Sequence, residues 1–587
     1  MRAMNMKRAM LSTRLPLALL ASLLLTAAAY AAAPGITGTT FALTAQTAFL
    51  NQPDGNAVYS WGYGCATGST PAFAATLSGA NFPNANCPTM QVPGPTLIVK
   101  EGTTVSVTLT NQLPTAAGNT SILFPDFAMT STCPTGQQGL LACEALPGGT
   151  VTYTFSTTGQ AGTHAYYSGT QGDLQVEMGL YGAIIVLPAS VPANCMSGYA
   201  SSNTAAQVYW GETDWRNAWA AYDHPGSCYD REYLFQWAEM DPNIHRQALA
   251  QVTALGACTA GAQGCSLKVP TEPYHPAYFL VNGRSMPDVM DPNYDPIYPH
   301  QPYNGNPHMH PGEQVLIRTV GQGRWQHPFH EHGNHVRILA RDGNMVLSSS
   351  TTQIPYSTPG SSIVSGPALA GLLMFNTDTT PGQAFDGIFY WSARGLNWDA
   401  FGHNPTSPDP LATLACNPDV NGYNTGDPTA ANYFEWCQDH NKPLEANPFG
   451  DVNSGGPTTL PNPNIFTNGP WYGGTPYLGP DATIRSSSTL RNDPGGHAIN
   501  GTTGPVTVSG CVTGGTVINP GTSTNPTPGC TNLQPSNVQA NPANERGFAF
   551  MWHSHNEREI TTNNVFPGGM LMMMLVDSRE FRIDESQ

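Results

Sequence analysis

The sequence predicts an all-β protein, and two observations favour that class. Only 10% of the 587 residues are charged, whereas glycine occurs 61 times and proline 52 times, and this composition favours many turns over long helices. Several segments alternate apolar and polar residues, as Val105, Val107 and Leu109 do. A period of two is the pattern of a half-buried strand, so we expect sheets of short strands joined by turns.

The N-terminal segment, residues 1–31, is predicted to be a signal peptide. A basic start is followed by an apolar run from Leu15 to Ala29, and Ala29-Tyr30-Ala31 has the pattern of a cleavage site. The apolar run is too short and too interrupted for a membrane anchor, and no later segment approaches a spanning length. We therefore expect an exported protein without a membrane span, either secreted or held in the periplasm or cell envelope.

Net charge limits the classes of partner that the protein can bind, and cysteine content indicates its compartment. The formal net charge of −17 at pH 7 argues against binding to nucleic acid or to an anionic membrane surface. The 12 cysteines are an even number and suit an oxidising compartment. Because they fall as close neighbours in the sequence, we expect mostly local disulfides, although connectivity is not fixed by sequence. The neighbours are Cys65 and Cys87, Cys133 and Cys143, Cys195 and Cys228, Cys258 and Cys265, Cys416 and Cys437, and Cys511 and Cys530.

Strands are predicted in two regions, which are separated near Val208. The first region holds two strands across a glycine turn and two later strands; these are Met90–Asn111, Val151–Phe155 and Tyr181–Leu187. The second region holds Arg231–Glu239, Tyr278–Arg284, Gln314–Val320 and Thr380–Trp391. Residues 392–546 form a long insertion rich in Asn, Gly, Pro, Thr and Ser, with four cysteines. A structureless loop of this length is implausible, so we expect a disulfide-containing cap or small subdomain.

Two histidine pairs are the candidate functional residues. His330 and His332 are two apart, so on a strand their rings leave the same face, and His553 and His555 repeat this spacing far downstream. If the two strands are neighbours, four imidazoles meet. Such a set suits Cu(II) and, more loosely, Zn(II).

These motifs resemble those of the multicopper oxidase family, whose last cupredoxin domain carries His-Pro-x-His-x-His-Gly and later His-Cys-His. Residues Met90–Pro188 resemble the family's first cupredoxin domain, with Pro-Gly-Pro and Gly-Leu-Tyr-Gly. The resemblance implies tandem cupredoxin-like Greek-key β-sandwiches or barrels. We assign one domain to residues 32–195 and another to 205–580, which includes the insertion; a divergent third domain stays open.

The resemblance also shows which copper ligands are missing. In the first domain the family's histidine positions hold Leu123, Pro125, Tyr167 and Gly169. Nearby His164 has the wrong strand parity to replace them, and we expect it to be a hydrogen-bonded structural histidine. The first domain is therefore expected to give no histidine to a three-copper cluster, and four-electron oxygen reduction is expected to be lost.

The type 1 copper site is expected to be absent as well. Ser554 stands in place of the cysteine and Glu559 in place of the second histidine, so only His327 remains, with Met570 as a loose axial candidate. A serine hydroxyl is a far poorer copper ligand than a thiolate. The run Met570–Met574 is expected to be core rather than a Cu(I) site. We expect His308 and His310 to lie in a loop.

The predicted metal ligands are His330, His332, His553, His555 and His327, with Glu331 and His335 as groups that orient ligands. The predicted function is copper binding by an exported multicopper-oxidase-like protein. Two alternatives stay open: an atypical copper-dependent oxidase of metal ions or phenols, and a structural extracellular or envelope protein with a vestigial cluster. The sequence allows a homo-oligomer without predicting one.

Overall fold

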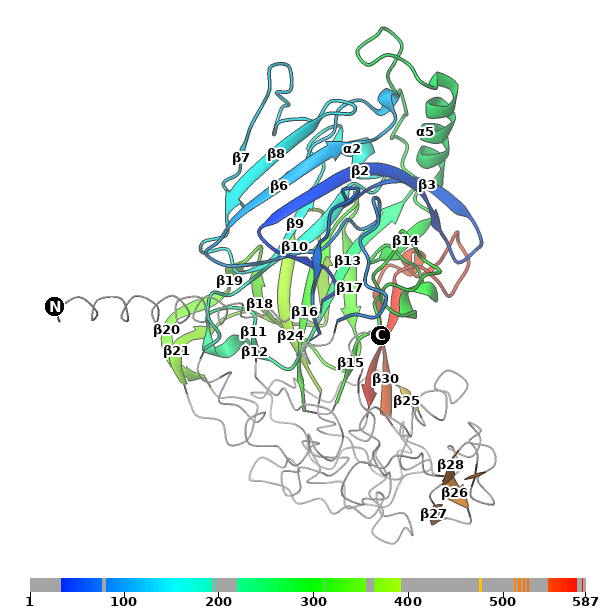
Figure 1. The fold of residues 1–587 in the computed structure, drawn as a ribbon. Coiled ribbons are helices and arrows are strands. Elements are labelled where there is room, and N and C mark those ends of the chain that lie inside the picture. Colours follow the sequence, from blue (N-terminus) through cyan, green and yellow to red (C-terminus); the bar gives the residue numbers. More distant parts are fainter. Residues whose placement is uncertain are drawn as a thin grey trace, which may run out of the picture.

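The computed structural model describes residues 33–76, 81–192, 195, 219–310, 312–354, 364–391, 475–477, 511–513, 516–518, 521–522, 525–526, 547–577 and 583. The predicted signal peptide and most of the 392–546 insertion lie outside these ranges. Within them the fold is almost all-β, as the composition and strand patterns predict (Figure 1). No helix in these ranges is both long and apolar enough to cross a membrane.

Two five-stranded sheets form the N-terminal sandwich. The first sheet runs in the order β4 (Ala72–Phe73), β1 (Ile36–Thr37), β5 (Leu97–Lys100), β10 (Tyr181–Leu187) and β9 (Gly162–Tyr167). The second runs β3 (Ala57–Cys65), β2 (Thr40–Asn51), β6 (Thr104–Asn111), β8 (Thr150–Ser156) and β7 (Thr130–Ser131). Alternate residues of β6 such as Val105, Val107 and Leu109 are fully buried between the sheets, because every second side chain of a strand faces the core.

Two larger sheets form the second sandwich. One runs β14 (Tyr278–Val281), β13 (Arg231–Met240), β16 (Gln314–Gly321), β24 (Ala384–Tyr390), β18 (Val336–Arg341) and β19 (Asn344–Met345), with β22 (Leu373–Met374) also on β18. The other runs β15 (His308–Met309), β31 (Leu571–Asp577), β30 (Gly547–Ser554), β17 (His327–Glu331) and β23 (Asn376–Thr379), with β25 (Thr475–Tyr477) on β30. Aromatic residues fill this core, including Trp237, Phe329 and Trp552. The domain boundaries themselves stay a prediction.

The two sandwiches pack against each other through an apolar layer. Ala183 and Ile185 of β10 join Leu234 of β13, Val320 of β16 and Ala384 of β24 in one buried cluster. In Figure 1, β9 and β10 accordingly lie beside β16 and β24. The interface is therefore a continuous part of the protein interior.

The remaining elements are short, with one exception. The paired ribbons are β11 (Trp219–Ala220) with β12 (Cys228–Tyr229), β20 (Leu347–Ile354) with β21 (Val364–Leu369), β26 (Cys511–Thr513) with β27 (Thr516–Ile518), and β28 (Gly521–Thr522) with β29 (Asn525–Pro526). The short helices are α2 (Gly172–Gln175), η1 (Thr115–Ala117), η3 (Pro225–Ser227), η4 (Asp288–Met290) and η6 (Glu557–Ile560). The exception is α5 (Pro242–Leu255), 14 residues long, which the strand patterns did not predict.

Helix α5 has ordinary end signals. The Asp241 side chain accepts a hydrogen bond from the Asn243 backbone N–H, Pro242 occupies the first helical position, and Gly256 ends the helix at a positive φ of 52°. Aspartate before proline at the start and glycine at the end are preferred at these positions. The helix packs on the N-terminal sandwich through Ile244 and Ala248.

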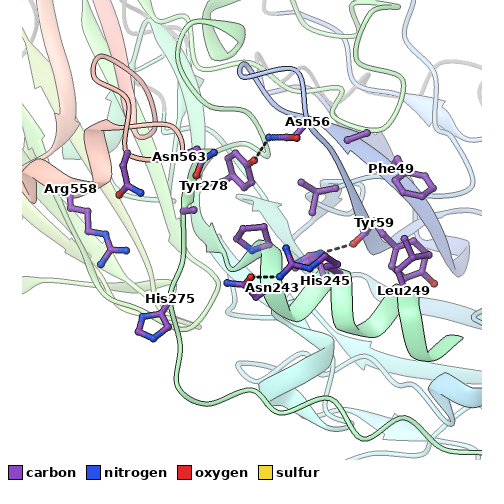
Figure 2. A pocket seen from close by; sticks show the side chains of 16 residues that line it. Phe49, Asn56, Tyr59, Asn243, His245, Leu249, His275, Tyr278, Arg558 and Asn563 are labelled. Atoms are coloured by element: carbon purple, nitrogen blue, oxygen red, sulfur yellow. Dashed lines mark hydrogen bonds between the residues drawn. The ribbon is translucent and has the colours of Figure 1, made fainter. Parts of the chain in front are cut away.

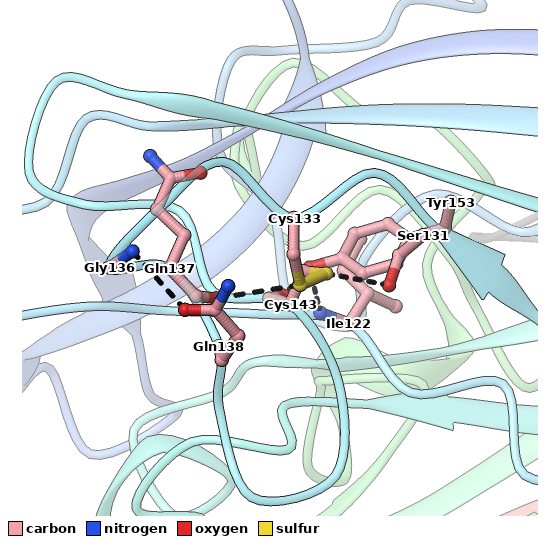
Figure 3. Close-up of a disulfide and its surroundings, with 8 residues drawn as sticks. All are labelled: Ile122, Ser131, Cys133, Gly136, Gln137, Gln138, Cys143 and Tyr153. Atoms are coloured by element: carbon pink, nitrogen blue, oxygen red, sulfur yellow. Dashed lines mark hydrogen bonds between the residues drawn. A yellow bond between two sulfur atoms is a disulfide. The ribbon is translucent and has the colours of Figure 1, made fainter.

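Four of the predicted local disulfides are present: Cys65–Cys87, Cys133–Cys143, Cys195–Cys228 and Cys258–Cys265. The other predicted neighbours, Cys416 with Cys437 and Cys511 with Cys530, fall outside the side chains that the structure describes. Figure 3 shows how Cys133–Cys143 closes a loop on the N-terminal sandwich. There the Tyr153 hydroxyl donates to the Cys143 carbonyl at 2.7 Å, and the Ser131 hydroxyl donates to the Cys143 sulfur at 2.8 Å.

Candidate metal centre

The two predicted histidine pairs lie on adjacent strands. β17 and β30 pair antiparallel, and the register places His330 directly opposite His553. Because directly opposite residues share a face, the rings of both pairs gather on the same side of the sheet. One nitrogen from each of His330, His332 and His553 lies within 4.8 Å of the others. Three imidazoles therefore converge where the sequence predicts them.

Backbone carbonyls determine which ring nitrogen faces the cluster. His330 Nδ1 lies 2.5 Å from the Phe375 carbonyl, and His553 Nδ1 lies 2.7 Å from the Ser554 carbonyl. A carbonyl oxygen only accepts, so Nδ1 must carry the proton in both rings, which leaves the lone pair on Nε2. His332 Nε2 lies 3.2 Å from His553 Nε2. This donor set fits a metal ion, because a ligating imidazole is commonly oriented through its other ring nitrogen.

His555 borders this cluster. Its ring centroid lies 4.8 Å from that of His330 and 5.9 Å from that of His553, with the His553 and His555 rings nearly parallel. Its side chain is exposed, unlike those of His330 and His553. The cluster thus consists of three converging histidines and a fourth at its open side.

Burial favours the neutral form of two histidines of the cluster, His330 and His553. Burial, aided by the neighbouring imidazoles, lowers the pKa of His330 to about 4, although the hydrogen bond to the Phe375 carbonyl acts in the opposite direction. Burial also lowers the pKa of His553. Neutral imidazole is the form that binds a metal, so these rings need lose no proton at neutral pH.

The two residues expected to orient the ligands are Glu331 and His335, and their contacts differ. Glu331 falls on the opposite face of β17, because neighbouring strand residues alternate, and it accepts a hydrogen bond from the Thr377 hydroxyl at 3.0 Å. Burial raises the pKa of this carboxyl well above its usual range. The His335 ring lies against Phe375, with 5.1 Å between centroids. The expectation for Glu331 was therefore wrong, and the strand parity explains why.

His327 lies apart from the other histidines. It is three residues from His330 and so faces the other side of β17. Its Nε2 lies 2.9 Å from Glu239 and its Nδ1 lies 2.9 Å from Glu559. Burial alone would lower the pKa of His327, but the hydrogen bonds to the two carboxylates outweigh it and raise the pKa to about 9. In place of a metal, this imidazole holds a proton between two carboxylates.

Glu559 also accepts a hydrogen bond of 2.5 Å from the Ser554 hydroxyl. His327, Ser554 and Glu559, the three positions aligned with type 1 ligands, therefore meet at one point. The sequence did not predict the remaining members of this buried network. The Tyr274 hydroxyl lies 3.0 Å from Glu239 and 2.6 Å from Glu177. These partners lie too far from His327 in the sequence for spacing to reveal them.

Of the other expectations, those for His164 and the methionine run are confirmed, and the one for His308 is wrong. His164 is fully buried between Asp126 and the Gln160 carbonyl, each at 2.9 Å, which confirms its structural role. Met570, Met572 and Met574 are fully buried in the second core, as expected. His308 lies in the short strand β15 rather than in a loop, with Nδ1 2.7 Å from Asp577.

The comparisons with known proteins agree with the motifs. Residues 86–190 match the family model described as multicopper oxidase. This stretch, in the N-terminal sandwich, is therefore similar to a multicopper oxidase domain. An L-ascorbate oxidase of Brassica rapa subsp. pekinensis is 25% identical over 325 residues, which cover 55% of this chain and 47% of that protein. The chain thus spans about half the length of that curated relative.

Solved structures of the family give weaker similarity. A multicopper oxidase named mgLAC has a TM-score of 0.38 at 13% identity, covering 93% of this chain and 87% of its own. A blue copper oxidase from Nitrosomonas europaea has the same score and identity, covering 91% of this chain and 85% of its own. Scores of this size carry no argument about the site.

Proposed function

We propose that this multicopper oxidase relative binds a copper ion through His330, His332 and His553, with His555 at the open side. The observation that carries this proposal is the convergence of three imidazoles. In His330 and His553, Nδ1 is bonded to a backbone carbonyl, which leaves Nε2 as the nitrogen that can bind a metal. Copper is favoured over zinc because imidazole ligands suit it and because residues 86–190 match the family model described as multicopper oxidase. A bound Cu(II) would supply a one-electron redox centre.

The usual four-electron oxygen reduction is proposed to be lost. A side chain at position 169 would meet the Leu123 side chain at 2.6 Å, so leucine fills the space beside one aligned histidine position. At the aligned type 1 positions, the Ser554 hydroxyl donates to Glu559, and Glu559 bonds to His327, so neither residue offers copper a thiolate or an imidazole. These contacts support a copper-binding protein over an oxidase of metal ions or phenols, which is the competing function.

We further infer export to an oxidising compartment. Four disulfides within the described residues are expected of a secreted or envelope protein and are rare in a reducing one. The predicted signal peptide gives the same location.

Calorimetric titration with Cu(II) tests the copper site. We expect near-stoichiometric binding by the native chain and its loss in the double variant His553→Ala with His555→Ala. Those side chains face the cluster and not the core, so the circular dichroism spectrum should be unchanged. The matched control is His308→Ala with His310→Ala, a second pair at the same spacing, which should keep the site. Equal affinity and stoichiometry in native chain and His553/His555 variant would show that the cluster is vestigial.

A further inference from the structure

A cavity of about 550 Å³ lies away from the histidine cluster. Four separate parts of the chain form it: the β2–β3 hairpin, the start of α5, residues 275–278 and the segment 558–564 after η6 begins (Figure 2). Its volume falls within the range of small-molecule sites. Neither the copper proposal nor the sequence motifs assign it a role.

Hydrogen bonds hold the walls of the cavity together. The Asn563 backbone N–H donates to the Ala277 carbonyl at 2.8 Å, and Arg558 Nη2 donates to the Pro276 carbonyl at 3.1 Å. On the other wall, Asn56 Nδ2 donates to the Tyr278 hydroxyl at 3.0 Å. The cavity is therefore built before any ligand arrives, and this lowers the ordering cost of binding.

The lining carries positive charge in an acidic protein. It contains Arg246, Arg558 and exposed His275 but no Asp or Glu, although the chain has a net charge of −17. The start of α5 adds little to this, because the Asp241 carboxylate that caps the helix offsets the positive field at its first turn. One carboxylate borders the lining without being part of it: Asp54 accepts from the Tyr278 hydroxyl at 3.0 Å. The positive charge of the lining is therefore carried by the two arginine side chains.

The opposite end of the cavity is apolar. Figure 2 shows Arg558 and His275 toward one end, and Phe49 and Leu249 toward the other. Phe49 is 50% exposed, and its ring meets that of Tyr59 edge-on at 5.8 Å. An exposed aromatic ring at the mouth of a cavity is a contact surface for a flat apolar group. The site thus joins an anion-binding end to an aromatic end.

We propose that this cavity binds a small aromatic carboxylate, with the carboxylate toward Arg558 and Arg246 and the ring against Phe49. Arginine suits this role because its planar donors match a carboxylate. The proposal does not depend on copper binding, because no residue is shared with the histidine cluster.

Titration calorimetry of the full chain with sodium benzoate at neutral pH tests this. We expect saturable one-to-one binding, whereas benzyl alcohol, which lacks the charge, and inorganic phosphate, which lacks the ring, should bind at least roughly tenfold more weakly. Arg558→Gln and Arg246→Gln should each weaken benzoate binding by roughly tenfold. Phe49→Ala should weaken it as well.

Lys100→Gln is the matched control, since it removes one exposed positive charge at the end of β5. It should leave benzoate affinity unchanged. The proposal is overturned if the native chain shows no saturable benzoate binding, or if the arginine variants bind as well as Lys100→Gln. Phosphate binding as tight as benzoate binding would mean a site for inorganic anions and would overturn the aromatic assignment.

Discussion

At the scale of single residues, His330 and His327 show how neighbours determine the charge of one side chain. Both rings come from strand β17. Burial, with neighbouring imidazoles adding to it, lowers the pKa of His330 to about 4, whereas the two carboxylates beside His327 outweigh burial and raise its pKa to about 9. One face of the strand therefore offers neutral ligands, and the other face holds a buried cation.

This difference predicts a pH-dependent stability. The pKa of His327 is higher in the folded protein than the ordinary value of about 6.5 in the unfolded chain. The protonated His327 ring therefore contributes on the order of 3 kcal/mol to the free energy of unfolding. This contribution is fully present below pH 6.5 and is lost as pH rises through about 9. Urea unfolding at pH 6, 7.5 and 9.5 should show this loss in the native chain.

The variant His327→Gln provides the comparison. It should be less stable at pH 6 by about 3–5 kcal/mol, because it leaves two buried carboxylates without their cation. It should also lack most of the decline toward pH 9.5. Parallel pH profiles for the two proteins would contradict a charged His327.

At the scale of elements, the alternation of apolar and polar residues predicted strands, and the two-residue spacing of the histidines predicted their cluster. Thr104–Asn111 and Tyr181–Leu187 form strands where their patterns place them, and the two pairs of histidines meet because β17 and β30 are neighbours. The same parity rule separates His327 from His330, and applying it to that pair would have removed His327 from the ligand set.

Sequence could not reveal contacts made across the fold. The Glu239 side chain reaches His327 from β13, and Glu559 reaches it from η6. Which strands become neighbours depends on the whole sheet order, and a single sequence has no local signal for that order. Helix α5 was not predicted for another reason. Asp241-Pro242 and Gly256 are typical of helix ends, but the sequence was interpreted from its strand-like composition and patterns.

Disulfides give a prediction at this scale. Cys195–Cys228 spans 33 residues and Cys258–Cys265 spans 7. If the bridges act by restricting the unfolded chain, replacing the first pair by serine should cost about 1.4 kcal/mol more than replacing the second. Urea unfolding of both double variants measures the difference. Equal losses would mean that native contacts around the bridges, and not loop length, determine their effect.

At the scale of the whole molecule, the two sandwiches share a polar contact within their apolar interface. Thr163 of β9 donates its hydroxyl to Asp386 of β24 at 2.6 Å and accepts from Arg318 of β16 at 3.0 Å. Arg318 also lies 2.5 Å from Glu232. All four side chains are almost completely buried. Each buried charge is therefore stabilised only by its hydrogen-bonding and ionic partners, some of which lie in the other sandwich.

This contact should couple the unfolding of the two sandwiches. Thr163→Val keeps the shape but removes the hydroxyl, so Arg318 and Asp386 each lose a buried partner, at a cost of about 1–3 kcal/mol. The control Thr158→Val changes an exposed threonine of the same sandwich and should be nearly neutral. Scanning calorimetry should show a single transition in the native chain and a lower or divided transition in Thr163→Val. If Thr163→Val and Thr158→Val show the same unfolding transition, the apolar layer alone couples the two sandwiches. The buried charges would then stabilise each sandwich without coupling them.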